Sequence, residues 1–233
     1  MRLEIASYKA VKYACLNFHY AKSVPVNTFG YSVFNDKNEW CGVIVYGTGA
    51  TPNIGSQYNL KQGQIVELVR MALNGKQSST SKAMAISLKL LKKKLPLCKM
   101  VVSYADIDQN HTGIIYQATN WVYVGDCNEN TRTGFIINGK KVHNKSLHGM
   151  GKEQSINGAR SIDPNATAFV SKGKRKYLYP LDKRLNEICQ SLSKPYPKKL
   201  SGVVESNANS QLDVKCVATT LTPLVTDTKI IEK

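Results

Sequence analysis

His19 and Tyr20 are adjacent residues able to do chemistry, and they follow a segment whose apolar spacing predicts a helix. The polar loop between that segment and Pro25 can project both side chains over a neighbouring sheet. Histidine titrates near neutrality and also ligates metals, so His19 suits proton transfer or iron binding. A capping or packing role explains His19 equally well.

Asp106 ends a predicted strand, and Ser103 and Tyr104 stand just before it. A carboxylate at the end of a strand can accept a proton from a reacting amine or hold a metal ion. The alternative is that Asp106 caps the helix that follows, although Asp108 is the better cap candidate. Asp106 is the first acidic residue after a long basic stretch, which favours a functional role.

A hydroxyl-rich loop follows a predicted strand that carries Glu67 and Arg70. These two residues are three apart, so regular alternation points them to opposite faces. Arg70 can hold a carboxylate or phosphate with two hydrogen bonds, and a salt bridge at the edge of the core is an equal alternative. The loop offers hydroxyl and backbone donors at Ser78, Ser79, Thr80 and Ser81. We expect Ser81 to cap the next helix in either case.

The elements that position these residues can be predicted from apolar spacing and turn residues. The stretch 65–125 predicts strand, loop, amphipathic helix, strand and second helix, with polar residues gathered where the strands end. A helix is predicted at 7–18 with Ser7 as its N-cap, and hairpins are predicted around 35–38 and at Asn138-Gly139. One more strand is predicted at 176–180. Residues 144–174 are rich in Gly, Ser and Asn, and residues 200–233 resemble a tail.

The chain has 32 Lys and Arg against 16 Asp and Glu, a net charge of +16. Clustered positive charge of this kind predicts binding to a polyanion, and nucleic acid is favoured over a basic surface that only aids solubility. The candidate DNA-binding residues are Lys89, Lys92, Lys93, Lys172, Lys174, Arg175 and Lys176. No run of apolar residues is long enough for a membrane span, and the six scattered cysteines favour reduced, buried thiols.

Two resemblances follow from these motifs. Tyr116, Asn120-Trp121 and Gly125 have the spacing seen in GCN5-related N-acetyltransferases, and 65–95 looks like the donor-binding unit of that family. The donor loop of this chain lacks the glycines of that family in its second half, which disfavours coenzyme A. The ordered set FHYAKSVP, ELVRMAL, SLKLLKK, VVSYAD and H-x-G-x-IYQATNW resembles the phage Mom family more closely. This resemblance covers 7–125, with weaker support from KYLYP.

The resemblance implies an α/β fold of the acetyltransferase type, with three layers and a central mixed, mostly antiparallel sheet flanked by helices. It implies site roles for His19 and Tyr20, for Ser103, Tyr104 and Asp106, and for Tyr116 as an acid that protonates a leaving group. The alternative for Tyr116 is that its ring only packs on a helix near Trp121. It places Arg70 and the loop 78–81 beside the donor. Iron is an implied cofactor, with His19, Tyr20 and Asp106 as its ligand set. Aromatic residues such as Tyr46, Tyr58, Tyr104 and Tyr123 are candidates to stack on a flipped base, but most of them are expected to belong to the core.

The resemblance further implies an enzyme that converts adenine N6 in duplex DNA to a carbamoylmethyl derivative and so protects phage DNA from restriction. The donor would be an activated glycine-like or acyl group, with acetyl-CoA as one candidate. The alternatives are a CoA-dependent N-acetyltransferase and a non-catalytic DNA-binding protein. We expect a catalytic domain at 1–185 with a mobile insertion at 144–174, and an extension or tail at 186–233. The expected location is the cytoplasm, that of the host cell if the protein is viral; a homodimer is a candidate assembly.

Overall fold

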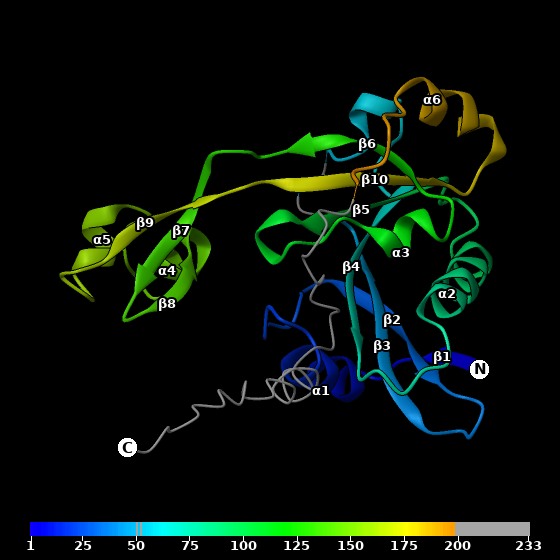
Figure 1. Cartoon of the computed structure of the whole chain (residues 1–233), viewed down its shortest axis with the longest axis horizontal. Helices are drawn as coiled ribbons and strands as arrows, with labels where there is room; N and C mark the ends of the chain where they lie inside the picture. Colours follow the sequence, from blue (N-terminus) through cyan, green and yellow to red (C-terminus); the bar gives the residue numbers. More distant parts are fainter. Residues whose placement is uncertain (50, 52, 199–233) are drawn as a thin grey trace, which may run out of the picture.

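A seven-stranded sheet with the strand order β1-β2-β3-β4-β5-β10-β6 forms the centre of the protein (Figure 1). The structure, a computed structural model, describes residues 1–49, 51 and 53–198. Neighbouring strands are antiparallel except β4 and β5, which are parallel. The strands are β1 Arg2–Ile5, β2 Thr28–Phe34, β3 Trp40–Gly47, β4 Ile65–Leu73, β5 Met100–Asp106, β6 Val122–Cys127 and β10 Lys174–Pro180. The predicted mixed, mostly antiparallel sheet is confirmed.

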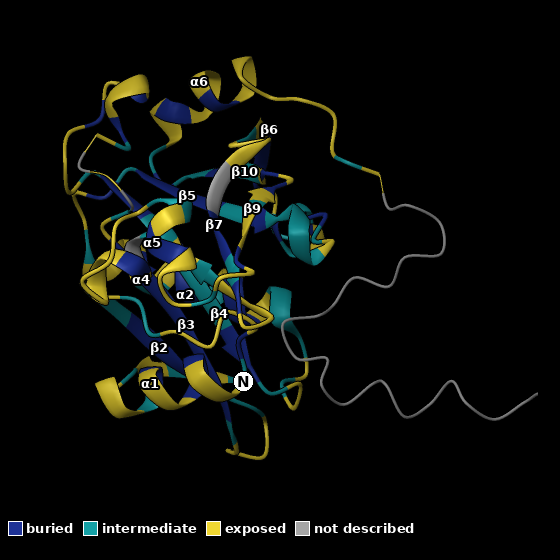
Figure 2. Cartoon of the chain, turned by 90° about the vertical axis from the view of Figure 1, so that its left-hand side faces the viewer, coloured by how far each residue is buried: buried dark blue, intermediate teal, exposed yellow. Residues whose placement is uncertain are grey.

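Helices cover both faces of this sheet and make three layers. Alternate residues of β3 separate the two sides, because Val43 and Val45 pack in the cluster under α1 (Tyr8–Asn17), whereas Ile44 and Tyr46 pack in the cluster under α2 (Thr80–Lys94). Figure 2 shows the buried strands between exposed helices. The two sides of the sheet are called the α1 face and the α2 face below. None of the described helices has the length and apolar character needed to cross a membrane.

Most predicted elements occur at their predicted positions. Ser7 caps α1 by accepting a hydrogen bond from the amide of Ala10 at 3.2 Å, and both predicted hairpins form. The second helix of the 65–125 stretch is wrong in extent, because α3 spans only Ile114–Gln117 and is followed by β6. Asn120 adopts a left-handed conformation that ends the helical turn, and WVYVG continues as strand.

Residues 131–171 form a separate small unit, which we call the arm. It contains a sheet of β8 (Lys140–His143), β7 (Thr131–Ile137) and β9 (Thr167–Ser171), with α4 (Asn144–Gly149) and α5 (Ile156–Arg160) packed on it. Its core includes Phe135, Leu147 and Ala159. The segment 144–174, predicted to be a mobile insertion, therefore has its own helices and strand, and its mobility remains a prediction.

The chain returns to the main sheet after β10. The short helices η3 (Lys183–Leu185) and α6 (Asn186–Ser191) follow, and Cys189 is buried in the cluster that covers Met100 and Val102. The Tyr196 hydroxyl donates to the Trp121 carbonyl at 2.6 Å. The predicted domain boundary at 185 remains a prediction, and the predicted tail at 200–233 lies outside the described residues.

Candidate active site

The parallel strands β4 and β5 separate partway along their length. Their pairing runs from Ile65 opposite Met100 to Leu68 opposite Ser103, although both strands continue beyond that point. At the last pair the Ser103 hydroxyl donates to the Leu68 carbonyl at 2.8 Å. The sheet therefore opens between the second halves of the two strands, where the 65–125 stretch predicted a crevice.

A β-bulge in β4 changes which face Arg70 occupies. Val45 pairs with Arg70 and Tyr46 pairs with Leu68, so Val69 is an extra residue opposite β3. Arg70 therefore lies on the α1 face with Val45, and Glu67, opposite Gly47, lies on the same face. The prediction that Glu67 and Arg70 point to opposite faces is wrong, because it assumed an unbroken alternation.

The structure brings together four predicted site residues from three parts of the chain. Tyr20 donates its hydroxyl to Asp106 Oδ2 at 3.3 Å, and the His19 and Tyr20 rings lie 4.4 Å apart. Asp106 lies on the α1 face with Arg70. Every second residue of β5 points to the same face, so Asp106 is on the same side as Met100 and Val102. Burial and the Asp106 carboxylate raise the pKa of Tyr20, so the phenol keeps its proton at neutral pH.

His19 is buried and neutral. Its Nδ1 accepts a hydrogen bond from the Ala21 amide at 3.1 Å, so the ring proton is on Nε2. Burial, together with the nearby charges of Arg70, His111 and Lys22, lowers the pKa of His19 to about 3. The geometry supports a role in which His19 packs on Tyr20 and holds it toward Asp106.

Acidification should therefore reduce stability through His19. The unfolded state binds a proton below pH 6.5 and the folded state does not, so this contribution is complete above pH 6.5 and is lost as the pH falls toward 3. Between pH 7 and pH 5 the loss should reach up to about 2 kcal/mol. Urea unfolding at both pH values measures it. His19→Asn keeps an acceptor for the Ala21 amide, and its free energy of unfolding should fall less between pH 7 and pH 5. An equal fall in the wild-type protein and the variant would contradict this account.

Asp106 caps a short helix and also contacts Tyr20. Its Oδ1 accepts from the Asp108 amide at 3.0 Å and caps η2 (Ile107–Gln109), while Oδ2 faces Tyr20. Asp108, predicted as the better cap, instead accepts hydrogen bonds from the Ser171 hydroxyl and the Lys172 amide. The cap fixes one carboxylate oxygen of Asp106 and leaves the other on the α1 face.

Ser103 and Tyr116 form a buried pair on the α2 face of the opening. Their oxygens are 2.8 Å apart. Because the Ser103 proton goes to the Leu68 carbonyl, the Tyr116 hydroxyl is the donor in this pair. Burial raises the pKa of Tyr116 to about 12, so it is a proton donor rather than a base at neutral pH. Tyr116 stacks on Tyr177 at 4.7 Å, which fixes its ring.

Tyr104 and Asp106 have basic neighbours across the sheet. Lys176 is opposite Tyr104 and Lys174 is opposite Asp106 in the β5–β10 register, so all four side chains share one face. Burial lowers the pKa of Lys176, which lies over the Tyr58 ring at 5.2 Å. Lys174 is exposed. A carboxylate and a cation available for phosphate therefore lie side by side.

The other residues predicted to contact DNA differ in whether they are exposed and in how close they lie to Asp106. Lys172 is exposed, but Arg175 points to the opposite face from Lys174 and donates to the His111 carbonyl at 2.6 Å. Lys92, although exposed, donates to the Leu181 carbonyl at 2.8 Å, at the end of the sheet where β5 begins. The seven residues of β5 span roughly 20 Å, so Lys92 and its neighbours Lys89 and Lys93 lie far from Asp106. The basic end of α2 therefore does not adjoin the opening.

The predicted donor loop is held at the start of α2. Ser79, rather than the predicted Ser81, caps the helix by accepting from the Lys82 amide at 3.2 Å, and Ser81 lies in the first turn. The Gln77 side-chain amide donates a hydrogen bond to the Thr80 hydroxyl at 3.0 Å. Ser78 contributes to lowering the pKa of Asp36 in the β2–β3 turn, as a smaller effect than the N-terminal amino group. The loop thus belongs to the α2 face.

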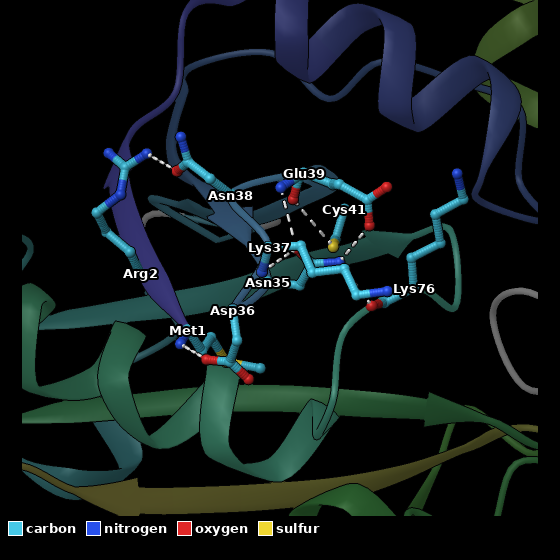
Figure 3. Close-up of polar contacts among 9 residues, drawn as sticks. All are labelled: Met1, Arg2, Asn35, Asp36, Lys37, Asn38, Glu39, Cys41 and Lys76. Atoms are coloured by element: carbon cyan, nitrogen blue, oxygen red, sulfur yellow. Dashed lines mark hydrogen bonds and ion pairs between the residues drawn. The ribbon is translucent and has the colours of Figure 1, made fainter.

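The β2–β3 turn supports this loop from the other side (Figure 3). The Asn35 amide donates to the Lys76 carbonyl at 3.2 Å and to Glu39 at 2.7 Å. The N-terminal amino group of Met1 pairs with Asp36. A groove of about 360 Å³ lies next to the loop, between α2 and the residues after α3, and is lined by Ser81, Lys82, Ala85, Leu88, Ala118, Thr119, Asn120 and Tyr179.

The implied iron site is not supported by the donors present. Within the part of the chain that the structure describes, no group of three or more His, Cys, Asp or Glu could hold a metal ion. Tyr20 is protonated and donates to Asp106, and the Arg70 charge beside His19 opposes a second cation. The cluster fits proton transfer better than iron binding.

Two contributors to the site, His111 and Glu67, were given no role by sequence reasoning. The His111 ring contacts Tyr20 edge-on at 5.6 Å, and Arg175 holds the His111 backbone. Burial raises the pKa of Tyr104, and the Glu67 carboxylate raises it further by a smaller amount. His111 stands in the motif H-x-G-x-IYQATNW, which was a usable signal. Glu67 lies near Tyr104 because β4 pairs with β5, with Glu67 opposite Val102, and this pairing is not evident from the sequence.

Comparison with known proteins places the chain in a family. It is 25% identical over 206 residues to the methylcarbamoylase mom of Escherichia phage Mu, covering 85% of this chain and 84% of that protein. A variant of spermidine N-acetyltransferase from Vibrio cholerae has a TM-score of 0.45 at 9% identity, covering 81% of this chain and 99% of that one. A Bacillus subtilis acetyltransferase in complex with CoA has a TM-score of 0.44 at 12% identity, covering 77% and 98%. The family model for Mom proteins matches residues 1–198, and the chain therefore belongs to the Mom protein family.

Proposed function

We propose that this protein is a transferase that modifies adenine N6 in duplex DNA, and that the group it adds is carbamoylmethyl. The observation that carries the proposal is the pairing of Lys174 with Asp106 across β10 and β5. A carboxylate able to accept a proton lies beside an exposed cation able to bind phosphate. Membership of the Mom family supports the same reaction. Adenine N6 lies within the base stack, so the target nucleotide is extruded from the duplex before it reaches Asp106.

Each face of the opening receives one of the two reactants. The base enters from the α1 face, where Tyr20, Arg70 and Asp106 meet. The donor lies on the α2 face, where Tyr116 is. N6 forms a bond to the transferred carbon, the bond from that carbon to the leaving atom breaks, and the N6 proton passes to Asp106. Tyr116 supplies a proton to the leaving atom.

The donor that gives a carbamoylmethyl product is an activated glycine-like group; an acyl donor would give an N6-acyl product instead. The loop 78–81 and the groove beside it supply hydroxyls, the start of a fifteen-residue helix and Lys82, all of which suit a phosphate or carboxylate on the donor. Arg70, on the α1 face, supplies a second anchor for a donor group that reaches through the opening, because its buried Nε is without a hydrogen-bond partner among the described residues. The loop lacks close-approach glycines in its second half, and acetyl-CoA is one donor among those to test.

The proton-donor role of Tyr116 is separable from its structural role. Tyr116→Phe removes the acidic proton and should reduce modified adenine about 100-fold. Ser103→Ala removes the acceptor of that proton but keeps the phenol, and it should cost only about 1 kcal/mol of stability with most activity retained. Nucleoside analysis and thermal melting of both variants measure this. Equal activity losses in the two variants would show that the pair is only structural.

The function itself is tested by nucleoside mass spectrometry of plasmid DNA from cells that express the protein. A new adenine derivative supports the proposal. Unmodified adenine in the presence of folded protein would favour a DNA-binding protein without catalysis. Hydrolysis of acetyl-CoA in the absence of DNA would favour an acetyltransferase that acts on a protein or small amine.

A further inference from the structure

The arm extends away from the main sheet and is joined to it through β6 and β10 (Figure 1). Its own core is small and internal, and the mechanism proposed above uses none of its residues. The arm begins directly after β6 and ends directly before Lys174, the residue opposite Asp106. A structure placed here lies beside any duplex whose base occupies the opening.

The exposed surface of the arm is cationic. Lys140, Lys152 and Arg160 are exposed. The two acidic residues of the arm are engaged within it: Asp163 accepts from the Asn138 and Asn165 amides, and Glu153 accepts from the Ser155 hydroxyl. The net charge offered to a partner is therefore positive.

Two of these cations lie on neighbouring segments of the arm. The bond from the Asn138 amide to Asp163 at 2.7 Å brings the β7–β8 turn against the loop that follows α5. Lys140 follows that turn, and Arg160 ends α5 just before that loop. A turn and a helix end that carry adjacent cations suit the regular phosphate spacing of a duplex.

The inner end of the arm is fixed to the catalytic loop. Asp108, two residues after Asp106, accepts from the Ser171 hydroxyl at 2.8 Å and the Lys172 amide at 3.1 Å. It also pairs with Lys141 of β8 at 3.6 Å. The arm is thus held in a defined position next to Asp106, as a second contact on one bound molecule requires.

We infer that the arm is a second DNA-binding element, in which Lys140, Lys152 and Arg160 contact phosphates of the duplex that flanks the extruded base. This inference rests on the proposed function, since it assumes that duplex DNA is the substrate. The contacts carry no sequence information; they orient the duplex and add affinity that salt weakens.

The test is the affinity of a fluorescent duplex for the full chain over a series of KCl concentrations. The variant Lys140→Ala/Lys152→Ala/Arg160→Ala should bind at least about 10-fold more weakly in low salt, and the slope of log K against log salt should fall by about 2 to 3, since each lost phosphate contact removes about 0.9. The charge-matched control Lys9→Ala/Lys37→Ala/Lys61→Ala changes exposed lysines outside the arm. It should change the slope by less than about 1. Thermal melting confirms that both variants fold.

Failure of this inference is distinguishable from failure of the proposed function. If the wild-type protein neither binds nor modifies duplex DNA, the proposed function fails and the arm inference fails with it. If the wild-type protein does both and the arm variant matches the control, only the arm inference is overturned. An arm variant with unchanged DNA binding but altered sedimentation would overturn it in favour of a protein interface.

Discussion

Asp106→Asn is expected to reduce modified adenine in co-expressed plasmid DNA by at least about 100-fold, because it removes the carboxylate that accepts the N6 proton. The asparagine side chain has nearly the same shape and keeps an oxygen that can accept from the Asp108 amide, so the cap of η2 survives. Stability should change by less than about 1 kcal/mol. DNA affinity should change little. Mass spectrometry of nucleosides, thermal melting and duplex binding measure the three quantities.

Asp182→Asn is the matched control for this variant. Asp182 also caps a short helix, η3, by accepting from the Arg184 amide at 3.1 Å, and it lies beyond the opposite end of β10. It should keep wild-type levels of modification. Full modification by Asp106→Asn would remove Asp106 as the proton acceptor, and equal losses in both variants would indicate an effect of helix capping.

The second large effect is expected at Arg70. Its Nη1 donates to the Val69 carbonyl at 2.7 Å and its Nη2 lies 3.4 Å from the Ser23 hydroxyl, so the guanidinium is held with Nε left for a ligand. Arg70→Lys keeps the charge but has a single nitrogen on a flexible stem, which cannot make all of these bonds. It should reduce modification about 10- to 100-fold, by about 1.4 kcal/mol for each factor of ten.

Arg70→Gln separates the charge from the geometry. The Arg70 charge is the largest contribution after burial to the low pKa of His19, so this pKa should rise in the glutamine variant and remain low in the lysine variant. Titration of His19 by NMR measures it, and both variants should be poorly active. If Arg70→Lys is fully active, the donor does not depend on the geometry of the Arg70 guanidinium and only the positive charge matters.

The elements set by local signals could be predicted from the sequence. Asn138-Gly139 has the left-handed conformations that its hairpin turn requires, and Ser7 caps α1. Local chemistry was sufficient in these two cases. Tyr20 and Asp106 were placed in one site only by the family resemblance, as ligands of an iron ion, and not as the hydrogen-bonded pair that the structure has.

The features set by distant partners could not be predicted. The bulge at Val69 exists only through the register of β4 against β3, and it decides the face that Arg70 occupies. Arg175 was predicted to contact DNA, but it lies on β10 between β5 and β6, and its side chain donates to the His111 carbonyl. The lysines of α2 follow the same pattern, since only the tertiary fold separates them from Asp106.

The central claim is best tested by the nucleosides themselves. Plasmid DNA from cells that express the wild-type chain should contain a deoxyadenosine derivative in which one N6 hydrogen is replaced by a carbamoylmethyl group, and DNA from cells that express Asp106→Asn should contain almost none. If folded wild-type protein leaves every deoxyadenosine unmodified, the proposed function is contradicted. A new adenine derivative with a different added group would keep the DNA-modifying activity and refute the carbamoylmethyl assignment.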